Sequence, residues 1–130
     1  MDRHILLVDD HEGFVNAAAI FLEKKGYRVA KAYDGVEALE QVAKEAPDLI
    51  ILDVMMPRLD GWATLESLQS NPQTAAIPVL MLTALKDEEH MRQGFATGCT
   101  WFYGKPISDF EDFALVIRTI MESTASDEET

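Results

Sequence analysis

Five residues of this chain each follow or close an apolar or aromatic segment and carry a group suited to charge chemistry: Asp9, Asp10, Asp53, Thr83 and Lys105. The segments are "ILLV" before the acid pair, "LIIL" before the third acid, "VLML" before the hydroxyl and "WFY" two residues before the lysine. Carboxylates a few Å apart repel one another, which raises at least one pKa unless a cation offsets the charge. The pattern therefore indicates a site for a hard divalent cation, and Mg²⁺ suits a site with few carboxylates and room for water and a phosphoryl oxygen.

The remaining side chains of this set indicate what such a cation would assist. A carboxylate can attack phosphorus and form an acyl phosphate, and Asp53 is the candidate nucleophile because its segment is central. Lys105 would neutralise one phosphoryl oxygen, and the Thr83 hydroxyl would donate a hydrogen bond to another. A phosphoryl group on Asp53 would add charge of roughly −1 or more, enough to draw a hydroxyl-bearing loop inward and act as a switch.

These residues need a sheet that brings the ends of separate strands together. Strands are predicted at residues 5–8, 27–32, 49–52, 78–83 and 101–103. "LIIL" is apolar on both faces, as a central parallel strand is, whereas "YRVAKA" alternates and carries charges that discourage pairing at a sheet edge.

Helices are predicted between these strands from apolar residues at helical spacing. The first ends at Lys24, Lys25 and Gly26, and the second begins with the capping-box spacing of Asp34 and Glu37. A third follows the turn "PRLDG", a weaker and highly charged one spans 86–97, and the last begins with a second capping-box match at Ser108 and Glu111.

Alternation of five strands with five helices predicts a single α/β domain with a doubly wound (βα)5 parallel sheet of order 2-1-3-4-5 and helices on both faces. Ligand sites in such sheets lie outside the carboxyl ends of the strands, where the five residues are expected to meet. The domain is expected to span residues 1–123, followed by a frayed acidic tail at 124–130.

The motifs "LLVDDHEG", "LIILDVMMPRLDGW", "PVLMLTA" and "FYGKPI" closely resemble, in order and separation, the receiver domain of two-component response regulators. The resemblance covers about residues 3–122. It implies Asp53 as phosphoacceptor and a Mg²⁺ site, with Mn²⁺ as a possible substitute, formed by Asp9, Asp10, Asp53 and the backbone carbonyl of Met55. Asp10 would be a direct ligand and Asp9 one that acts mainly through water.

The resemblance also implies Thr83 and Lys105 as phosphoryl contacts, a cis Lys105–Pro106 bond, and Phe102 as the aromatic switch residue, where many members have tyrosine. The phosphoryl donor would be a sensor histidine kinase or a histidine phosphotransfer protein. The surface formed by the fourth helix, fifth strand and fifth helix would bind an output protein that the sequence does not identify. The domain would catalyse only its own phosphorylation and dephosphorylation, and would not be an enzyme with a separate substrate.

Two positions that tune phosphoryl turnover in the family are apolar in this chain. Met55 lies two residues after the phosphoacceptor and Leu85 two residues after the threonine. Neither side chain can orient an attacking water, so slow loss of the phosphoryl group is expected.

Composition limits the partners and the location. With 23 acidic and 11 basic residues the net charge is −12, which works against direct binding to nucleic acid or to an anionic membrane. No apolar run reaches the roughly 18 residues of a membrane helix and no secretory signal is evident, so a cytoplasmic location is expected. The lone Cys99 fits a reducing compartment.

Three other classes remain as alternatives. A receiver-like interaction module that no longer uses phosphate is the main one, although the intact Asp, Thr and Lys set argues against it. A flavin-binding protein would need phosphate-binding donors where this chain has "DDHEG", and a dehalogenase-type phosphatase would need a second acid where Met55 stands.

Several further side chains are assigned structural roles. His4 and His90 are expected at the surface, and His11 is expected to face solvent at a helix start rather than to bind metal. Trp101 and Tyr103 should lie on the sheet face opposite Phe102, under a neighbouring helix.

Overall fold

A computed structural model describes residues 3–56, 58–84 and 101–129. Its sheet has five parallel strands in the order β2-β1-β3-β4-β5, which confirms the predicted topology. The strands are β1 (Arg3–Val8), β2 (Tyr27–Ala32), β3 (Leu49–Asp53), β4 (Val79–Ala84) and β5 (Trp101–Lys105). The charged strand β2 lies at the edge and the apolar strand β3 at the centre, as predicted.

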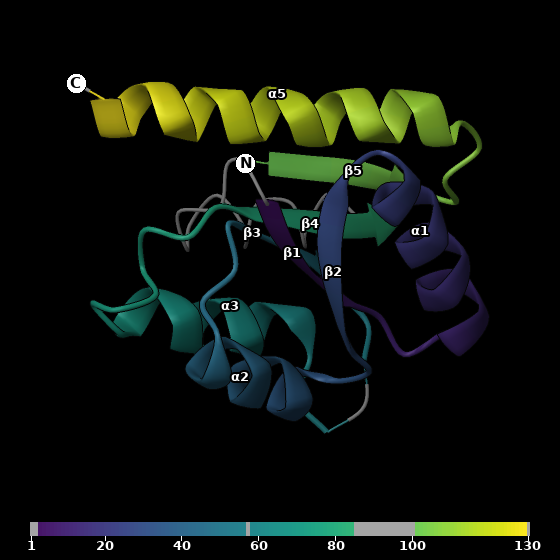
Figure 1. Cartoon of the computed structure of the whole chain (residues 1–130). Coiled ribbons are helices and arrows are strands. Elements are labelled where there is room, and N and C mark those ends of the chain that lie inside the picture. Colours follow the sequence, from purple (N-terminus) through teal and green to yellow (C-terminus); the bar gives the residue numbers. More distant parts are fainter. Residues whose placement is uncertain (1–2, 57, 85–100, 130) are drawn as a thin grey trace.

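Helices cover both faces of this sheet (Figure 1). They are α1 (Glu12–Lys24), α2 (Gly35–Lys44), α3 (Gly61–Ser70) and α5 (Phe110–Glu129). Helices α1 and α5 pack on one face, over one apolar cluster, and helices α2 and α3 pack on the other face, over a second cluster. The helix predicted at 86–97 lies outside the described residues.

Alternation along each strand divides the core between the two faces. Ile5 and Leu7 of β1 point to the α1–α5 side, whereas Leu6 and Val8 point to the α2–α3 side. All four are at most 1% exposed, because a central parallel strand is covered on both faces. The two clusters therefore cover both faces of the sheet.

Local signals account for most helix boundaries. The Asp34 side chain accepts a hydrogen bond from the Glu37 amide, as the capping-box spacing predicted, and Gly26 ends the α1 turn with a φ of 100°. The second capping prediction is wrong by one residue. Asp109, not Ser108, accepts from the amides of Glu111 and Asp112, since α5 begins at Phe110.

Two further predictions are corrected by the structure. His4 is 5% exposed rather than superficial, because it lies within β1 between the edge strand and the central strand. Helix α5 continues through Glu129, so the backbone of residues 124–129 is helical where a frayed tail was predicted. No glycine or proline occurs in "TASDEE" to end the helix earlier.

No helix among the described residues is both long enough and apolar enough to cross a membrane.

Candidate functional site

The carboxyl ends of four neighbouring strands bring the candidate residues to one edge of the sheet. Asp9 follows β1 and Asp53 ends β3, and these strands are direct neighbours. Thr83 pairs with Gly104 and Ala84 with Lys105, which places the hydroxyl and the ammonium on the adjoining strands β4 and β5. The strand ends therefore bring these residues to one edge of the sheet, as the sequence predicted.

One ammonium group connects two of the carboxylates. The Nζ atom of Lys105 is 2.7 Å from Oδ2 of Asp9 and 3.1 Å from Oδ1 of Asp53. Asp9 is fully buried and Asp53 is 4% exposed, so the carboxylates that accept these charge-assisted hydrogen bonds are shielded from water. The Lys105 ammonium also lies 5.5 Å from the centre of the Phe14 ring on α1. Residues 96 positions apart in the chain thus form one charged centre.

Asp53 is an unusual carboxylate because its environment opposes ionisation. Burial raises its pKa to about 6, with the negative charge of Asp9 acting in the same direction and Lys105 against it. Its ionised form therefore lacks full compensation in this structure. A carboxylate in this condition is suited to gaining a cation or to forming a bond through its oxygen.

The surroundings of Asp9 and Lys105, unlike those of Asp53, favour the charged form of each side chain. Burial alone would raise the pKa of Asp9, but hydrogen bonds from Lys105 and from the amide and ring of His11 outweigh it and lower that pKa. Burial would lower the pKa of Lys105, but the Asp9 hydrogen bond and the Asp53 charge raise it instead. Negative and positive charge are therefore both fixed at the edge.

The acid pair presents oxygen atoms at the mouth of the site. Asp10 has 34% of its side chain exposed and lies beside the fully buried Asp9. Carboxylate oxygens that differ in burial in this way can combine direct and water-mediated contacts to a small hard cation. The donor set of Asp9, Asp10 and Asp53 therefore fits Mg²⁺.

His11 contacts both acids, which sequence reasoning missed. Its side chain is 72% exposed, as expected, yet Nδ1 lies 3.0 Å from Oδ1 of Asp9 and 3.2 Å from Oδ1 of Asp10. The hydrogen bond to Asp9 and the charges of both acids raise the pKa of His11. The position of His11 directly after two acidic residues was the feature of the sequence that could have indicated this contact.

The remaining predicted residues occupy different environments. Thr83 is 3% exposed at the end of β4, and Met55 has 69% exposure in the segment after β3. Phe102 lies partly buried in the α2–α3 cluster, with its ring centre 6.4 Å from that of Trp62. Trp101 and Tyr103 pack on the opposite face against the α1–α5 cluster, as predicted. Leu85 lies outside the described residues.

The segment between β3 and α3 is held close to the phosphoacceptor candidate. The Gly61 amide donates to the Val54 carbonyl at 2.9 Å, and a Cβ on Gly61 would lie 2.3 Å from the Asp53 carbonyl oxygen. Arg58, at a φ of 65°, donates to Asp34 at 2.7 Å and so ties this segment to the start of α2. The Lys105–Pro106 bond is cis, as the resemblance implied.

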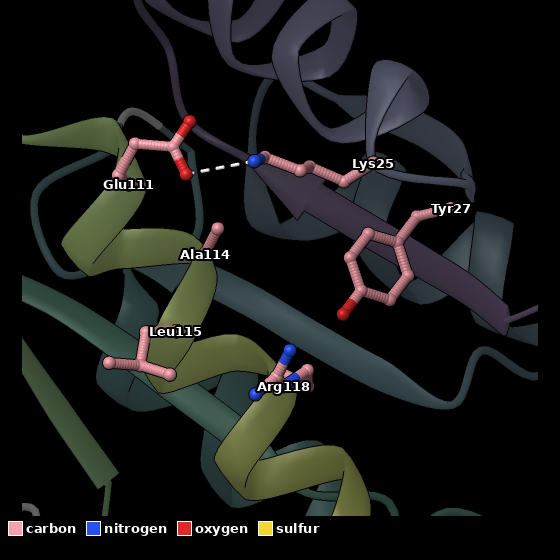
Figure 2. Close-up of a pocket in the computed structure, with 6 residues that line it drawn as sticks. All are labelled: Lys25, Tyr27, Glu111, Ala114, Leu115 and Arg118. Carbon is pink, nitrogen blue, oxygen red and sulfur yellow. Dashed lines mark hydrogen bonds and ion pairs between the residues drawn. The ribbon is translucent and has the colours of Figure 1, made fainter.

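A hollow of about 330 Å³ lies away from this edge, between the end of α1, β2 and α5 (Figure 2). Lys25 and Arg118 reach into it, but both cations already have acidic partners. Lys25 is 2.8 Å from Glu111, and Arg118 is 3.6 Å from Glu122. The Lys25–Glu111 ion pair joins the end of α1 to α5 beside this hollow.

Comparison with known proteins agrees with this geometry. The family model described as "Response regulator receiver domain" matches residues 5–118. "Response regulator PleD" of Caulobacter vibrioides is 41% identical over 116 residues, covering 89% of this chain and 26% of the relative. "Alkaline phosphatase synthesis transcriptional regulatory protein PhoP" of Bacillus subtilis is 42% identical over 123 residues, covering 95% of this chain and 50% of the relative.

Solved structures have the same architecture. The Vibrio cholerae chemotaxis protein CheY4 superposes with a TM-score of 0.85 at 31% identity, covering 92% of this chain and 98% of that one. The chain spans about a quarter of PleD and half of PhoP, so these two relatives contain further regions that this sequence does not match.

Proposed function

Because this chain belongs to the response regulator receiver domain family of two-component signalling proteins, we propose that Asp53 accepts a phosphoryl group and that the domain thereby switches its affinity for a partner. The observation that carries this proposal is the contact of one ammonium, Lys105 Nζ, with both Asp9 and Asp53. A lysine in that position compensates charge now and can compensate added phosphoryl charge later.

In the proposed reaction, an Asp53 carboxylate oxygen forms a bond to phosphorus while the bond from phosphorus to a histidine nitrogen of the donor breaks. The donor nitrogen keeps the electron pair and takes up a proton. Above pH 6 the Asp53 carboxylate is mainly ionised, since burial raises its pKa only to about 6. The nucleophile is therefore present at neutral pH without a separate base.

The other residues at the edge stabilise the group that Asp53 receives. Lys105 can follow the developing charge because it already reaches Asp53 at 3.1 Å. The Thr83 hydroxyl, on the neighbouring strand β4, would donate a hydrogen bond to a phosphoryl oxygen. Mg²⁺, held by Asp9, Asp10, Asp53 and the Met55 carbonyl, would neutralise charge on the transferring group, and Mn²⁺ could replace it.

We infer that phosphorylation alters a partner surface that includes β5 and α5. Phe102 lies on β5, directly after the first residue of the strand and three before Lys105, and packs against Trp62 of α3. Movement of Thr83 toward a phosphoryl group would change the space available to Phe102 on the neighbouring strand β5. The fourth-helix part of the proposed surface lies outside the described residues.

The proposed donor is a sensor histidine kinase or a histidine phosphotransfer protein, and the output partner is a protein. The net charge of −12 supports basic protein surfaces over nucleic acid as partners. An apolar Met55 beside the phosphoacceptor supports slow loss of the phosphoryl group, because its thioether cannot orient an attacking water.

Amide chemical shifts during titration with Mg²⁺ and a beryllium fluoride phosphoryl mimic test the switch. The proposal expects saturable shifts at Thr83 and Lys105, little change at Gln73 beyond the end of α3, and no response in Asp53→Asn. The Glu66→Gln variant is the matched control, since it removes an exposed charge distant in sequence from the site. An unchanged spectrum in the parent protein would favour the phosphate-independent interaction module instead.

A further inference from the structure

The His11 ring occupies a position next to the proposed cation site that the Mg²⁺ ligand set does not use. One ligand atom from each of Asp9, Asp10 and His11 lies within 4.8 Å of the others. The ring nitrogen Nδ1 is 3.0 Å from one acid oxygen and 3.2 Å from the other. The imidazole therefore faces the same space as the two carboxylates.

These separations match those of neighbouring ligands around one octahedral ion. Ligand atoms about 2.1 Å from a common ion lie about 3.0 Å apart when they are adjacent. The Nδ1 distances to Asp9 and Asp10 are close to that value. A displacement of the ring toward an ion bound by Asp10 would bring Nδ1 into contact with that ion, and the His11 side chain is 72% exposed.

The present hydrogen bond does not prevent coordination. Carboxylate oxygens only accept, so Nδ1 carries a hydrogen where it contacts Asp9 and Asp10. The neutral ring can hold that hydrogen on its other nitrogen instead, where the exposed imidazole meets water. Nδ1 then offers a lone pair to a cation, and no proton needs to be gained or lost overall.

We propose that His11 is a nitrogen ligand of the cation site and that it shifts the selectivity of this site toward Mn²⁺ and Ni²⁺ relative to Mg²⁺. This inference rests on the cation site of the proposed function and specifies which divalent ions that site prefers. Mg²⁺ prefers oxygen ligands, whereas imidazole binds first-row transition ions, with affinity rising from Mn²⁺ to Ni²⁺. Addition of an imidazole to the carboxylates and the carbonyl of this site therefore favours the later ions.

Calorimetric titration of the whole chain with Mg²⁺, Mn²⁺ and Ni²⁺ tests this selectivity. In His11→Gln, which replaces nitrogen by an amide oxygen, the ratio of Ni²⁺ to Mg²⁺ affinity should fall by about tenfold or more, since loss of even a partner that only orients a metal ligand costs about tenfold or more in affinity. Glu12→Gln is the control, since it removes a neighbouring exposed charge and should change all three affinities by a similar factor. Pulsed EPR of bound Mn²⁺ should show a nitrogen coupling in the parent protein that is absent in His11→Gln.

Each outcome separates this inference from the proposed function. An unchanged Ni²⁺ to Mg²⁺ ratio in His11→Gln, or no nitrogen coupling in the parent protein while Mg²⁺ still binds, overturns the role of His11 and leaves the Mg²⁺ site intact. A coupling that persists in His11→Gln overturns it too, because another nitrogen would be the ligand. Absence of binding by all three ions overturns the cation site itself.

Discussion

Replacing Asp53 by asparagine should stabilise the metal-free protein at pH 8. The buried carboxylate has a pKa raised from 3.8 to about 6, so ionising it costs the folded state more than the unfolded chain. At 1.36 kcal/mol for each pKa unit, this difference corresponds to at most about 3 kcal/mol. The asparagine side chain would have nearly the shape of the protonated carboxyl group and would avoid that cost, so we expect a gain of about 1–3 kcal/mol.

The sign of the pH dependence follows from the raised pKa. A proton binds Asp53 more tightly in the folded state, so the penalty is fully present above about pH 7 and diminishes as pH falls through 6 toward 3.8. The stability difference between Asp53→Asn and the parent protein should therefore be largest near pH 8 and close to zero near pH 4. Mg²⁺ should reduce the difference at pH 8, because it stabilises the folded parent protein by binding.

Urea unfolding in EDTA at pH 8, 6 and 4 measures this difference directly. Glu66→Gln is the matched control, since it changes the net charge equally at an exposed position and should show no comparable gain. If Asp53→Asn were no more stable than the parent protein at pH 8, or if its gain did not depend on pH, the reasoning about an uncompensated buried carboxylate would be refuted.

Three further perturbations probe the same edge of the sheet. Lys105→Met should destabilise the metal-free protein by about 2–4 kcal/mol at pH 8, because two buried carboxylates lose their shared cation, and a urea titration that finds no loss would contradict this. Gly61→Ala should lower the melting temperature and weaken Mg²⁺ binding, since the added Cβ would lie 2.3 Å from the Asp53 carbonyl oxygen; calorimetry giving parental values would argue against this close packing. Met55→Asn should accelerate loss of the phosphoryl group, because the asparagine amide can orient water. Intact mass over time follows this loss, and an unchanged decay would contradict the predicted role of Met55 in turnover.

The sequence predicted the fold closely because its strands are strongly patterned. Apolar runs such as "LIIL" specify central strands, and the alternating charges of "YRVAKA" mark β2 as an edge strand. The strand order then followed from right-handed crossovers between the successive parallel strands. The errors occur where local patterns are ambiguous. His4 was expected at the surface because the first strand was predicted to begin at residue 5, but β1 begins at Arg3 and His4 is buried within it.

The position of the site was predictable, but its internal contacts were not. Strand-end acids point to a common edge, which does not reveal that Lys105 reaches both Asp9 and Asp53. Such distances depend on side-chain conformations set by packing between distant segments. Likewise, a histidine after two acids can face water or turn back toward them, and only the structure distinguishes these for His11.

Intact mass after incubation with Mg²⁺ and a small acyl phosphate donor tests whether Asp53 is the phosphoacceptor. We expect one added phosphoryl group on the parent protein, none without metal, and none on Asp53→Asn. No addition to the parent protein, or equal addition to Asp53→Asn, would contradict the assignment of Asp53 as phosphoacceptor.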